Sequence, residues 1–336
     1  MGKSLKVLTL FDSHSAKPRG HDFAEEFEKD EWKSERHVVE GLRSLGHDVR
    51  MLGLFDDVAL LIEDVKEFAP DVVFNLMEEF HQDPCLVANV AAVLEMLGVA
   101  YTGSTPLGLR LCKDKALAKM ILVHHGVPTP PFQVFERDRV IKRSSGVKLP
   151  IVVKPKVEDA SYGIAKASVV EDDEALEERV RFVHESTGQA ALAEEYVDGR
   201  EVYVSILGAH RLRVFPLREV KFGQLAEGDN LPIATYKVKW DAAYRKKRGI
   251  EYVYVEDMEE ALVKKIEDIS RASYRALELG GYARVDVRMD QESRPYVLEV
   301  NPNPYLARDE DYAQSAERGG LPWEKLLQAI INEAVE

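Results

Sequence analysis

Cysteine is scarce in this chain, since the 336 residues include only Cys85 and Cys112. Two cysteines are too few for a disulfide framework, and this pair does not have the spacing of metal ligands. Proteins without structural disulfides are typical of reducing compartments, so we expect a cytoplasmic location.

Basic residues are outnumbered. The 45 lysines and arginines stand against 59 aspartates and glutamates, which gives a net charge of −14. No basic excess is available to neutralise a phosphate backbone or an anionic bilayer, so we expect no nucleic-acid partner and no membrane partner. A small anionic ligand is still compatible, because it needs only a local cluster of cations.

Long hydrophobic runs are also missing. No apolar run approaches the roughly 18 residues of a membrane span, and the N-terminal residues lack the apolar segment of a signal peptide. The composition is otherwise ordinary for a globular protein, with 45% hydrophobic and 31% charged residues. Single cores stop growing at about 250–300 residues, so a chain of this length is expected to form two or three subdomains.

The first third of the chain alternates between strand and helix patterns. This alternation predicts an α/β fold that begins with a doubly wound parallel sheet, with ligands beyond the carboxyl ends of its strands. The expected strands are Lys6–Phe11, Asp48–Leu54 and Asp71–Leu76, and the expected helices are Glu31–Leu45, Leu60–Phe68 and Leu86–Leu97.

The remaining two thirds are expected to be α+β. Strands at Ile151–Lys156, Ala191–Tyr196 and Glu201–Leu207 are expected to share a mixed sheet, followed by strands at Gly281–Met289 and Pro295–Val300. Val214–Tyr252 is polar and poorly periodic, and a stretch of that length inside a compact domain indicates a functional, mobile loop. Helices are expected at Lys113–His125, Glu171–Ser186, Met258–Leu279 and Trp323–Ala334.

The segment ARVDVRMD, followed by YVLEVNPNP, has the most informative chemistry. Alternate residues of a strand face one side, so Arg284 and Asp286 share a face. If the two strands pair, Asp286, Glu299 and Asn301 can converge. Two carboxylates and an amide supply the hard oxygen ligands that suit Mg²⁺, and Arg284 can clamp a phosphoryl group. A solvated charged strand face is the alternative.

Two further segments indicate a nucleotide site less sharply. In PIVVKPKVEDASYGI, Lys154 and Lys156 leave an apolar strand on one side, and Ser161 lies in the following loop, where hydroxyl and backbone groups can bind phosphate. In LAEEYVDGREV, a strand end with a nearby carboxylate can bind adenine and ribose. Taken alone, the first is equally an exposed loop and the second a simple hairpin.

The order of these motifs is more specific than any one of them. The sequence resembles the ATP-grasp ligases over nearly the whole chain, and within them the D-alanine–D-alanine ligases. The segments that carry this resemblance are YTGS (Tyr101–Ser104), DKALAK (Asp114–Lys119), PIVVKP, the EE-Y-x-x-GREV segment and RVD followed by LEVN.

The resemblance implies a role for each matching residue. The phosphate-contacting lysines are Lys115 and Lys154, and Lys239 is the mobile-loop lysine over the γ-phosphate. Arg284 is the transition-state arginine, and Glu35 receives the amino group of the first substrate. The adenine segment runs over Glu194, Glu195, Tyr196 and Val197, the ribose ligand is Glu201, and the metal ligands are Asp286, Glu299 and Asn301.

The sequence departs from the family where the family contacts amino acids. The usual two serines after the KP strand are Ala160 and Ser161 here, and Trp240 replaces the tyrosine that usually follows the mobile-loop lysine. The family's Pro-Gly-Met-Thr segment is replaced by NPNPYLARDEDY. A pocket that loses hydroxyl groups also loses selectivity for the substrate that formed hydrogen bonds with those groups. D-alanine is therefore not the expected substrate.

These observations predict an ATP-dependent carboxylate–amine ligase that works through an acyl phosphate with Mg²⁺ or Mn²⁺, two ions in all. The expected divisions are an N-terminal domain over 1–112 and the two ATP-grasp subdomains over 113–205 and 206–336. Small amino-acid or peptide substrates are expected, and a homodimer is left open. The alternatives are a hydroxyl or thiol acceptor, or a non-catalytic ATP-binding regulatory protein.

Overall fold

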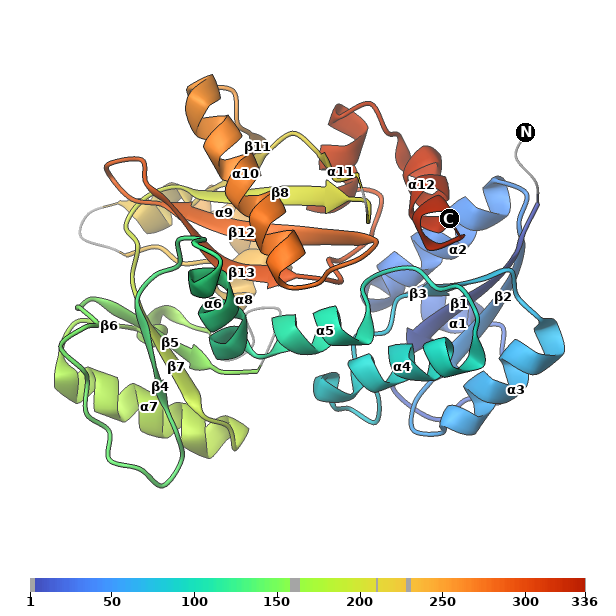
Figure 1. Cartoon of the computed structure of the whole chain (residues 1–336), viewed down its shortest axis with the longest axis horizontal. Helices are drawn as coiled ribbons and strands as arrows, with labels where there is room; N and C mark the ends of the chain where they lie inside the picture. Colours follow the sequence, from blue (N-terminus) through green and yellow to red (C-terminus); the bar gives the residue numbers. More distant parts are fainter. Residues whose placement is uncertain (1–3, 158–163, 210, 228–230, 336) are drawn as a thin grey trace.

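The computed structural model describes residues 4–157, 164–209, 211–227 and 231–335. Within these ranges the chain forms three β-sheets. Figure 1 shows that the first sheet and its helices occupy one end of the molecule, and the other two sheets occupy the opposite end. None of the helices in the described ranges combines the length and the apolar character needed to cross a membrane.

The N-terminal sheet is parallel, with strand order β2-β1-β3, as the alternation of patterns predicted. Lys6 lies opposite Asp48, and Val7 lies opposite Val72. The carboxyl ends of β1 and β3 therefore meet at one edge of the sheet. The strands are β1 (Lys6–Asp12), β2 (Asp48–Leu54) and β3 (Val72–Asn75).

Alternate residues of β1 supply two separate cores. Val7 and Phe11 pack toward α2 (Lys33–Ser44) and α12 (Trp323–Val335), whereas Leu8 and Leu10 pack toward the other side. Figure 1 shows α12 beside α2, although the two helices come from opposite ends of the chain. The helices on the other face are α3 (Val58–Phe68) and α4 (Val87–Leu97), and shorter elements are α1 (Ala24–Phe27), η1 (Asp30–Trp32) and η2 (Pro84–Leu86).

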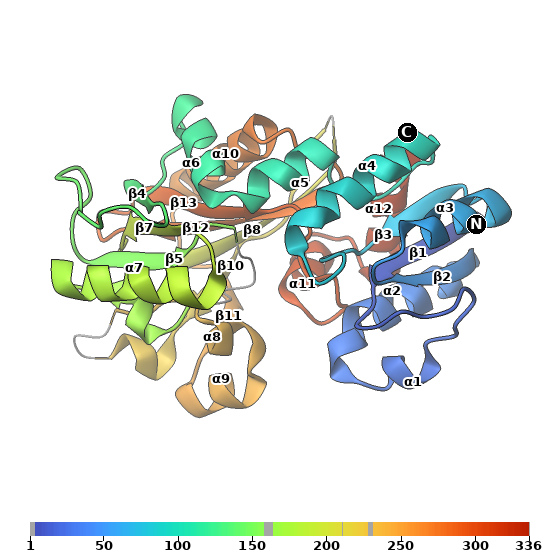
Figure 2. The same cartoon turned by 90° about the horizontal axis from the view of Figure 1, so that it is seen from below.

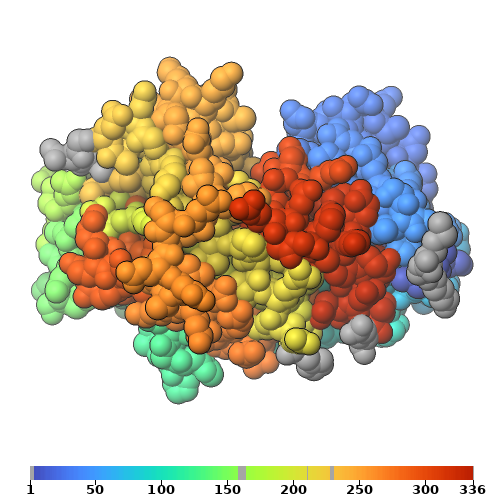
Figure 3. Space-filling model, turned by 90° about the horizontal axis from the view of Figure 1, so that it is seen from above, coloured from blue at the N-terminus to red at the C-terminus, as the bar shows by residue number. Residues whose placement is uncertain are grey.

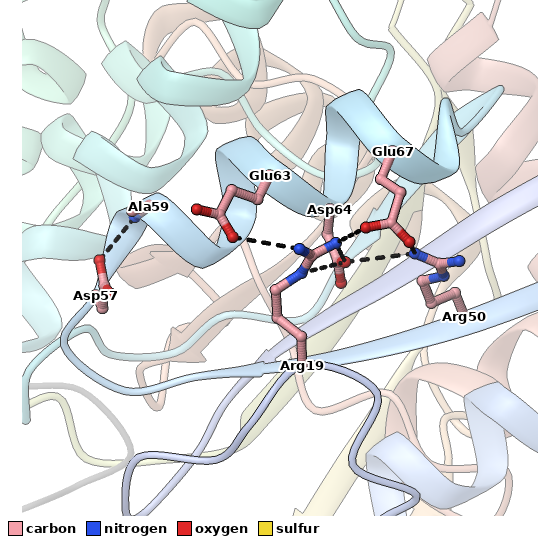
Figure 4. A network of polar contacts seen from close by, with 7 residues as sticks. All are labelled: Arg19, Arg50, Asp57, Ala59, Glu63, Asp64 and Glu67. Atoms are coloured by element: carbon pink, nitrogen blue, oxygen red, sulfur yellow. Dashed lines mark hydrogen bonds and ion pairs between the residues drawn. The ribbon is translucent and has the colours of Figure 1, made fainter.

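An ion-pair network fixes the segment after β1 against α3 (Figure 4). The guanidinium of Arg19 donates to the buried Asp64 carboxylate at 2.9 and 2.8 Å, and Arg50 approaches the same oxygen at 3.4 Å. Asp57 caps the helix by accepting a hydrogen bond from Ala59 N at 2.9 Å. A buried carboxylate is tolerated when it is paired in this way.

A helix that was not predicted links the N-terminal part to the rest. α5 (Pro106–Lys113) begins at a Thr-Pro signal, because the Thr105 hydroxyl accepts from Gly108 N at 3.0 Å and Pro106 occupies the first turn. The predicted Lys113–His125 helix instead starts at Lys115, as α6 (Lys115–His124), because Asp114 caps it.

The second sheet is antiparallel, with strand order β4-β7-β5-β6. The predicted mixed sheet is therefore wrong: β5 and β7 pair here, whereas Glu201–Leu207 belongs to another sheet. The strands are β4 (Phe132–Phe135), β5 (Ile151–Pro155), β6 (Val169–Val170) and β7 (Ala191–Glu195), and they are accompanied by η3 (Lys166–Ser168) and the predicted helix α7 (Asp173–Thr187).

The third sheet is also antiparallel, with order β11-β10-β8-β12-β13 and with β9 paired to β8. Figures 1 and 2 place α10 on one side of it and α8 and α9 on the other. Its elements are β8 (Glu201–Leu207), β9 (Arg213–Val214), β10 (Arg218–Lys221), β11 (Glu251–Tyr254), α10 (Glu260–Ala276), β12 (Tyr282–Met289), β13 (Pro295–Asn301) and α11 (Asp311–Arg318).

Two expectations for this region need correction. The segment 214–252 is not one long loop, because β10 and β11 pair within it. The candidate mobile loop, which we call the candidate lid, is therefore shorter and contains η4 (Gly223–Ala226), α8 (Tyr236–Trp240) and α9 (Ala242–Arg248). The expected boundary at 205–206 falls inside β8, which belongs entirely to the third sheet, so we propose a boundary before Glu201 instead.

Candidate active site

Two paired strands, β12 and β13, present the charged residues of the most informative motif. Asp286 lies opposite Glu299, and Arg284 lies opposite Asn301. The register shifts between Asp286 and Val287, so that Val287 pairs with Val297. Because of this bulge Val297 and Val300 both reach the core, which strict alternation does not allow. The regular alternation of faces expected of a strand is therefore interrupted in β13.

Arg284 and Asp286 form a fork-shaped ion pair. The Arg284 Nε and Nη2 atoms donate to the two Asp286 oxygens at 2.7 and 2.9 Å. Burial opposes the charge of Arg284, but the Asp286 carboxylate raises the pKa of the guanidinium above its usual value. The guanidinium also lies 4.6 Å from the centre of the Tyr203 ring. The arginine is thus held charged and in a fixed orientation.

Lys239, at the end of α8, reaches the same carboxylates. Its ammonium lies 3.5 Å from Asp286 Oδ2 and 3.5 Å from Glu299 Oε1. Burial opposes ionisation of Glu299, but Lys239 and the other nearby cations hold the pKa of this carboxyl well below its ordinary value. Glu299 is therefore held ionised, and the Lys239 ammonium lies within ion-pair distance of both carboxylates.

A cavity of about 600 Å³ opens in front of these strands. Figure 3 shows the hollow between the yellow-to-orange lobe and the blue N-terminal lobe. Lys33 of α2 and Tyr305 of the segment after β13 contribute to its wall. The candidate site residues on this wall are Lys115, Lys239, Arg284, Glu299 and Asn301.

A smaller cavity of about 60 Å³ lies on the second-sheet side. Lys239 and Glu299 line both cavities, so the two spaces share a wall. The other candidate residues of the small cavity are Lys154, Glu194, Glu195, Tyr196, Val197, Glu201 and Asp286. The structure thus brings the expected adenine, ribose, phosphate and metal residues into one continuous region.

Buried ion pairs organise the small cavity. Glu194 accepts a hydrogen bond from Lys154 at 2.5 Å and forms an ion pair with Lys119 at 2.8 Å. Glu201 accepts from the Tyr203 hydroxyl at 3.0 Å and lies 3.6 Å from Arg288. Burial raises the pKa of Glu201, whereas the two lysines overcome burial and lower the pKa of Glu194.

Three predicted site residues are not in this group. Glu35 and Lys156 line neither cavity, and Ser161 lies outside the described residues. Lys156 instead forms an ion pair with Asp114 at 3.0 Å, and its carbonyl accepts from Lys115 N at 3.1 Å. Its contacts therefore support the start of α6.

Glu35 lies in the first turn of α2. Its Oε2 atom is buried and has no hydrogen-bond partner within the described chain. Burial, with a smaller contribution from Asp12, raises its pKa to about 7. Burial and then the Glu35 charge raise the pKa of Tyr305, which does line the large cavity. Glu35 thus lies near enough to Tyr305, on the cavity wall, for its charge to act on that hydroxyl.

Sequence reasoning missed two buried cations. In the sequence, Lys119 stands out only as the last residue of the DKALAK motif, and Arg288 has no motif of its own. Arg288 donates to the Tyr196 hydroxyl at 2.9 Å and to the Pro232 carbonyl at 2.7 Å. Its position two residues after Asp286 was the available signal, since alternate strand residues share a face.

The donors on β12 and β13 suit a hard cation. They comprise two carboxylates and one amide, and the described residues contain no group of three or more His, Cys, Asp and Glu side chains that could hold a metal. The Lys239 ammonium between the two carboxylates shows that a positive charge fits there. Oxygen donors of this kind suit an ion that completes its shell with phosphate and water.

The antiparallel sheets, their cations and the two joined cavities define an ATP-grasp fold. Comparison with solved structures agrees. D-alanine–D-alanine ligase from Bacillus anthracis, complexed with ATP, matches with a TM-score of 0.75 and 22% identity, over 99% of this chain and 98% of that chain. The VanG D-Ala:D-Ser ligase from Enterococcus faecalis matches with a TM-score of 0.75 and 18% identity, over 99% and 100%.

Sequence comparison establishes the family. The family described as "D-ala D-ala ligase C-terminus" matches residues 121–332. D-alanine–D-alanine ligase from Bordetella pertussis is 30% identical over 304 residues, which cover 90% of this chain and 89% of that protein. The uncharacterized protein y4sG from Sinorhizobium fredii is 34% identical over 304 residues, 88% and 86% of the two chains. This chain belongs to the D-alanine–D-alanine ligase family and is an ATP-dependent ligase.

Proposed function

We propose that this enzyme uses ATP to activate a carboxylate as an acyl phosphate and then joins it to an amine. One observation carries the proposal. Arg284, Lys239 and Glu299 lie together on the wall of a cavity of about 600 Å³, and the last two also line the small cavity beside Glu194. A nucleotide in the small cavity would thus direct its phosphates toward a second substrate in the large one.

The charges of the site support this placement. We propose that Glu194, Glu195, Tyr196 and Val197 hold the adenine and that Glu201 holds the ribose. The phosphates then meet the lysines that border the shared wall, which are Lys115, Lys154 and Lys239. Asp286, Glu299 and Asn301 would hold Mg²⁺ or Mn²⁺, which neutralises polyphosphate charge.

The chemistry proceeds in two displacements. A carboxylate oxygen attacks the γ-phosphorus, the bond to the β-phosphate oxygen breaks, and ADP leaves. The amine then attacks the carbonyl carbon, the C–N bond forms, the C–O bond to phosphate breaks, and the amine proton goes to the departing phosphate. The protein contributes positioning and charge, with Arg284 stabilising the transferring group. No protein nucleophile is required.

The substrates are proposed to differ from two D-alanines. Trp240 lies edge-on to Tyr305 with ring centres 5.5 Å apart, and both line the large cavity. The replaced segment contributes most of its residues from Pro302 to Tyr312 to the same wall. Arg308, which belongs to the same segment, is exposed and does not line this cavity. Glu35 remains the proposed partner of a substrate ammonium, acting beside Tyr305.

The experiment is an ADP-release assay over D- and L-amino acids, dipeptides and hydroxy acids, with mass detection of the product. We expect an amide product from some amino-acid or peptide pair and a turnover with D-alanine well below about 1 s⁻¹, a value at the low end for ordinary enzymes. Turnover with D-alanine at or above that value would overturn the substrate proposal. ADP release only with hydroxy acids would overturn amide formation.

A further inference from the structure

Three charged side chains are buried together beneath the small cavity. Lys119 comes from α6, Lys154 from β5 and Glu194 from β7. Their side chains are only 2%, 6% and 4% exposed. The carboxylate oxygens divide between the lysines, with Oε1 2.5 Å from Lys154 and Oε2 2.8 Å from Lys119. Two ammonium groups thus share one carboxylate.

Only one of the two lysines faces the ligand space. Lys154 and Glu194 line the small cavity, whereas Lys119 lines neither of the two cavities. Burial lowers the pKa of Lys119, and the attraction of Glu194 opposes that effect. A charged amine buried away from any ligand is costly unless its partner needs it. The position of Lys119 therefore requires an explanation through Glu194.

Electrostatics supplies that explanation. With Lys119 present, Glu194 keeps a counter-ion even when Lys154 turns toward a phosphate. Without Lys119, Lys154 would be the only cation among the described residues that pairs with the buried Glu194 carboxylate. A nucleotide phosphate would then have to compete with Glu194 for Lys154. Leaving a buried carboxylate without a partner is strongly unfavourable, so Lys154 would stay with Glu194.

We propose that Lys119 is a positioning residue for nucleotide binding: it neutralises Glu194 and thereby makes Lys154 available to the phosphates of ATP. This inference rests on the proposed function, because it places a nucleotide in the small cavity. Lys119 does not touch the nucleotide and acts only through Glu194. Its effect should therefore depend on the phosphates of the ligand and on the charge of residue 194.

The test measures binding of adenosine, ADP and a non-hydrolysable ATP analogue by calorimetry. Lys119→Met should weaken the binding of ADP and of the analogue by at least about 10-fold, the scale of one charge-assisted hydrogen bond. It should change the affinity for adenosine by less than about 2-fold. Lys264→Met, at an exposed position of α10, is the matched control and should leave the affinities for all three ligands unchanged. Equal losses for adenosine and ADP, or no loss at all, would overturn the proposal.

A double-mutant cycle keeps the test independent of packing. In Glu194→Gln protein the carboxylate charge is gone, so adding Lys119→Met should change ADP affinity by less than about 2-fold. A loss of ADP affinity as large as in the wild-type background would show that Lys119 does not act through Glu194. If the wild-type protein bound adenosine and ADP with equal affinity, the role proposed for Lys154 would also be contradicted. If the wild-type protein bound no nucleotide at all, both the proposed function and this inference would fail.

Discussion

The ammonium nitrogen of Lys239 lies 3.5 Å from Asp286 Oδ2, although the two residues are 47 positions apart. Lys239 belongs to the short helix α8, and Asp286 belongs to the buried strand β12. A short helix of the candidate lid thus holds a cation against a buried carboxylate. This contact connects the candidate lid to the candidate metal site.

Glu299→Gln should reduce turnover by about 100-fold or more and leave the fold intact. The amide keeps the shape of the side chain but loses the charge that a divalent cation needs. ADP release measured across Mg²⁺ and Mn²⁺ concentrations is the readout. Glu292→Gln, at an exposed turn between β12 and β13, should behave as wild type. Unchanged kinetics in Glu299→Gln would remove this residue from the metal site.

Nucleotide should protect α9 from trypsin. The helix ends with Lys246, Lys247 and Arg248, all exposed, and it follows directly after α8. A lid that closes over the phosphates excludes water from the acyl phosphate, so cleavage there should slow with a non-hydrolysable ATP analogue and Mg²⁺. Cleavage after Arg139, in an exposed loop of the second sheet, is the internal control. Equal cutting of α9 in both states would argue against a lid.

Arg284→Lys should lower kcat by about 100-fold to 1,000-fold, the range seen when one donor to developing charge is removed. Lysine keeps the charge but cannot form the two bonds of 2.7 and 2.9 Å that hold the arginine against Asp286. Arg294→Lys, at a mostly exposed position of the nearby turn, is the control. If Arg284→Lys retained the wild-type kcat, a fixed guanidinium would not be needed for the reaction.

Glu35→Gln should stabilise the fold at alkaline pH. The pKa of Glu35 is raised by burial from 4.5 to about 7, so the folded state prefers the protonated carboxyl. Below about pH 4.5 the carboxyl is protonated in both the folded and the unfolded protein, so it does not affect stability. As pH rises through 7, the unfolded protein releases this proton more readily, and the buried carboxyl increasingly destabilises the fold. This destabilisation reaches at most about 3 kcal/mol. Removing the charge should therefore raise the free energy of unfolding at pH 8 and leave it unchanged at pH 4.

Urea unfolding at the two pH values measures this effect. Glu40→Gln, on the exposed side of the same helix, is the control and should show no such pH-dependent gain. A Glu35→Gln variant that is less stable than wild type at pH 8 would mean that the carboxylate has a favourable partner. In activity assays the same variant should weaken binding of the first substrate, if Glu35 receives its ammonium group.

Much of this fold could be predicted from the sequence, because the hydrophobic pattern of a short segment largely determines whether it forms a strand or a helix. Local sequence patterns predicted strands β1 and β2 and helix α7, and the order of the motifs predicted the ATP-grasp fold. Alternation along β12 put Arg284 and Asp286 on one face. These features depend on residues that are near one another in the chain.

Tertiary structure decided what depends on contacts between distant segments. The bulge that sets Glu299 beside Asp286 arises from pairing of two strands, and no period in either strand contains it. The packing of α12 on the N-terminal sheet joins the two ends of the chain. Lys119 reads as one more lysine on a helix until the fold buries it against Glu194. Burial and ion pairing depend on the whole fold, and the role proposed for Lys119 follows from both.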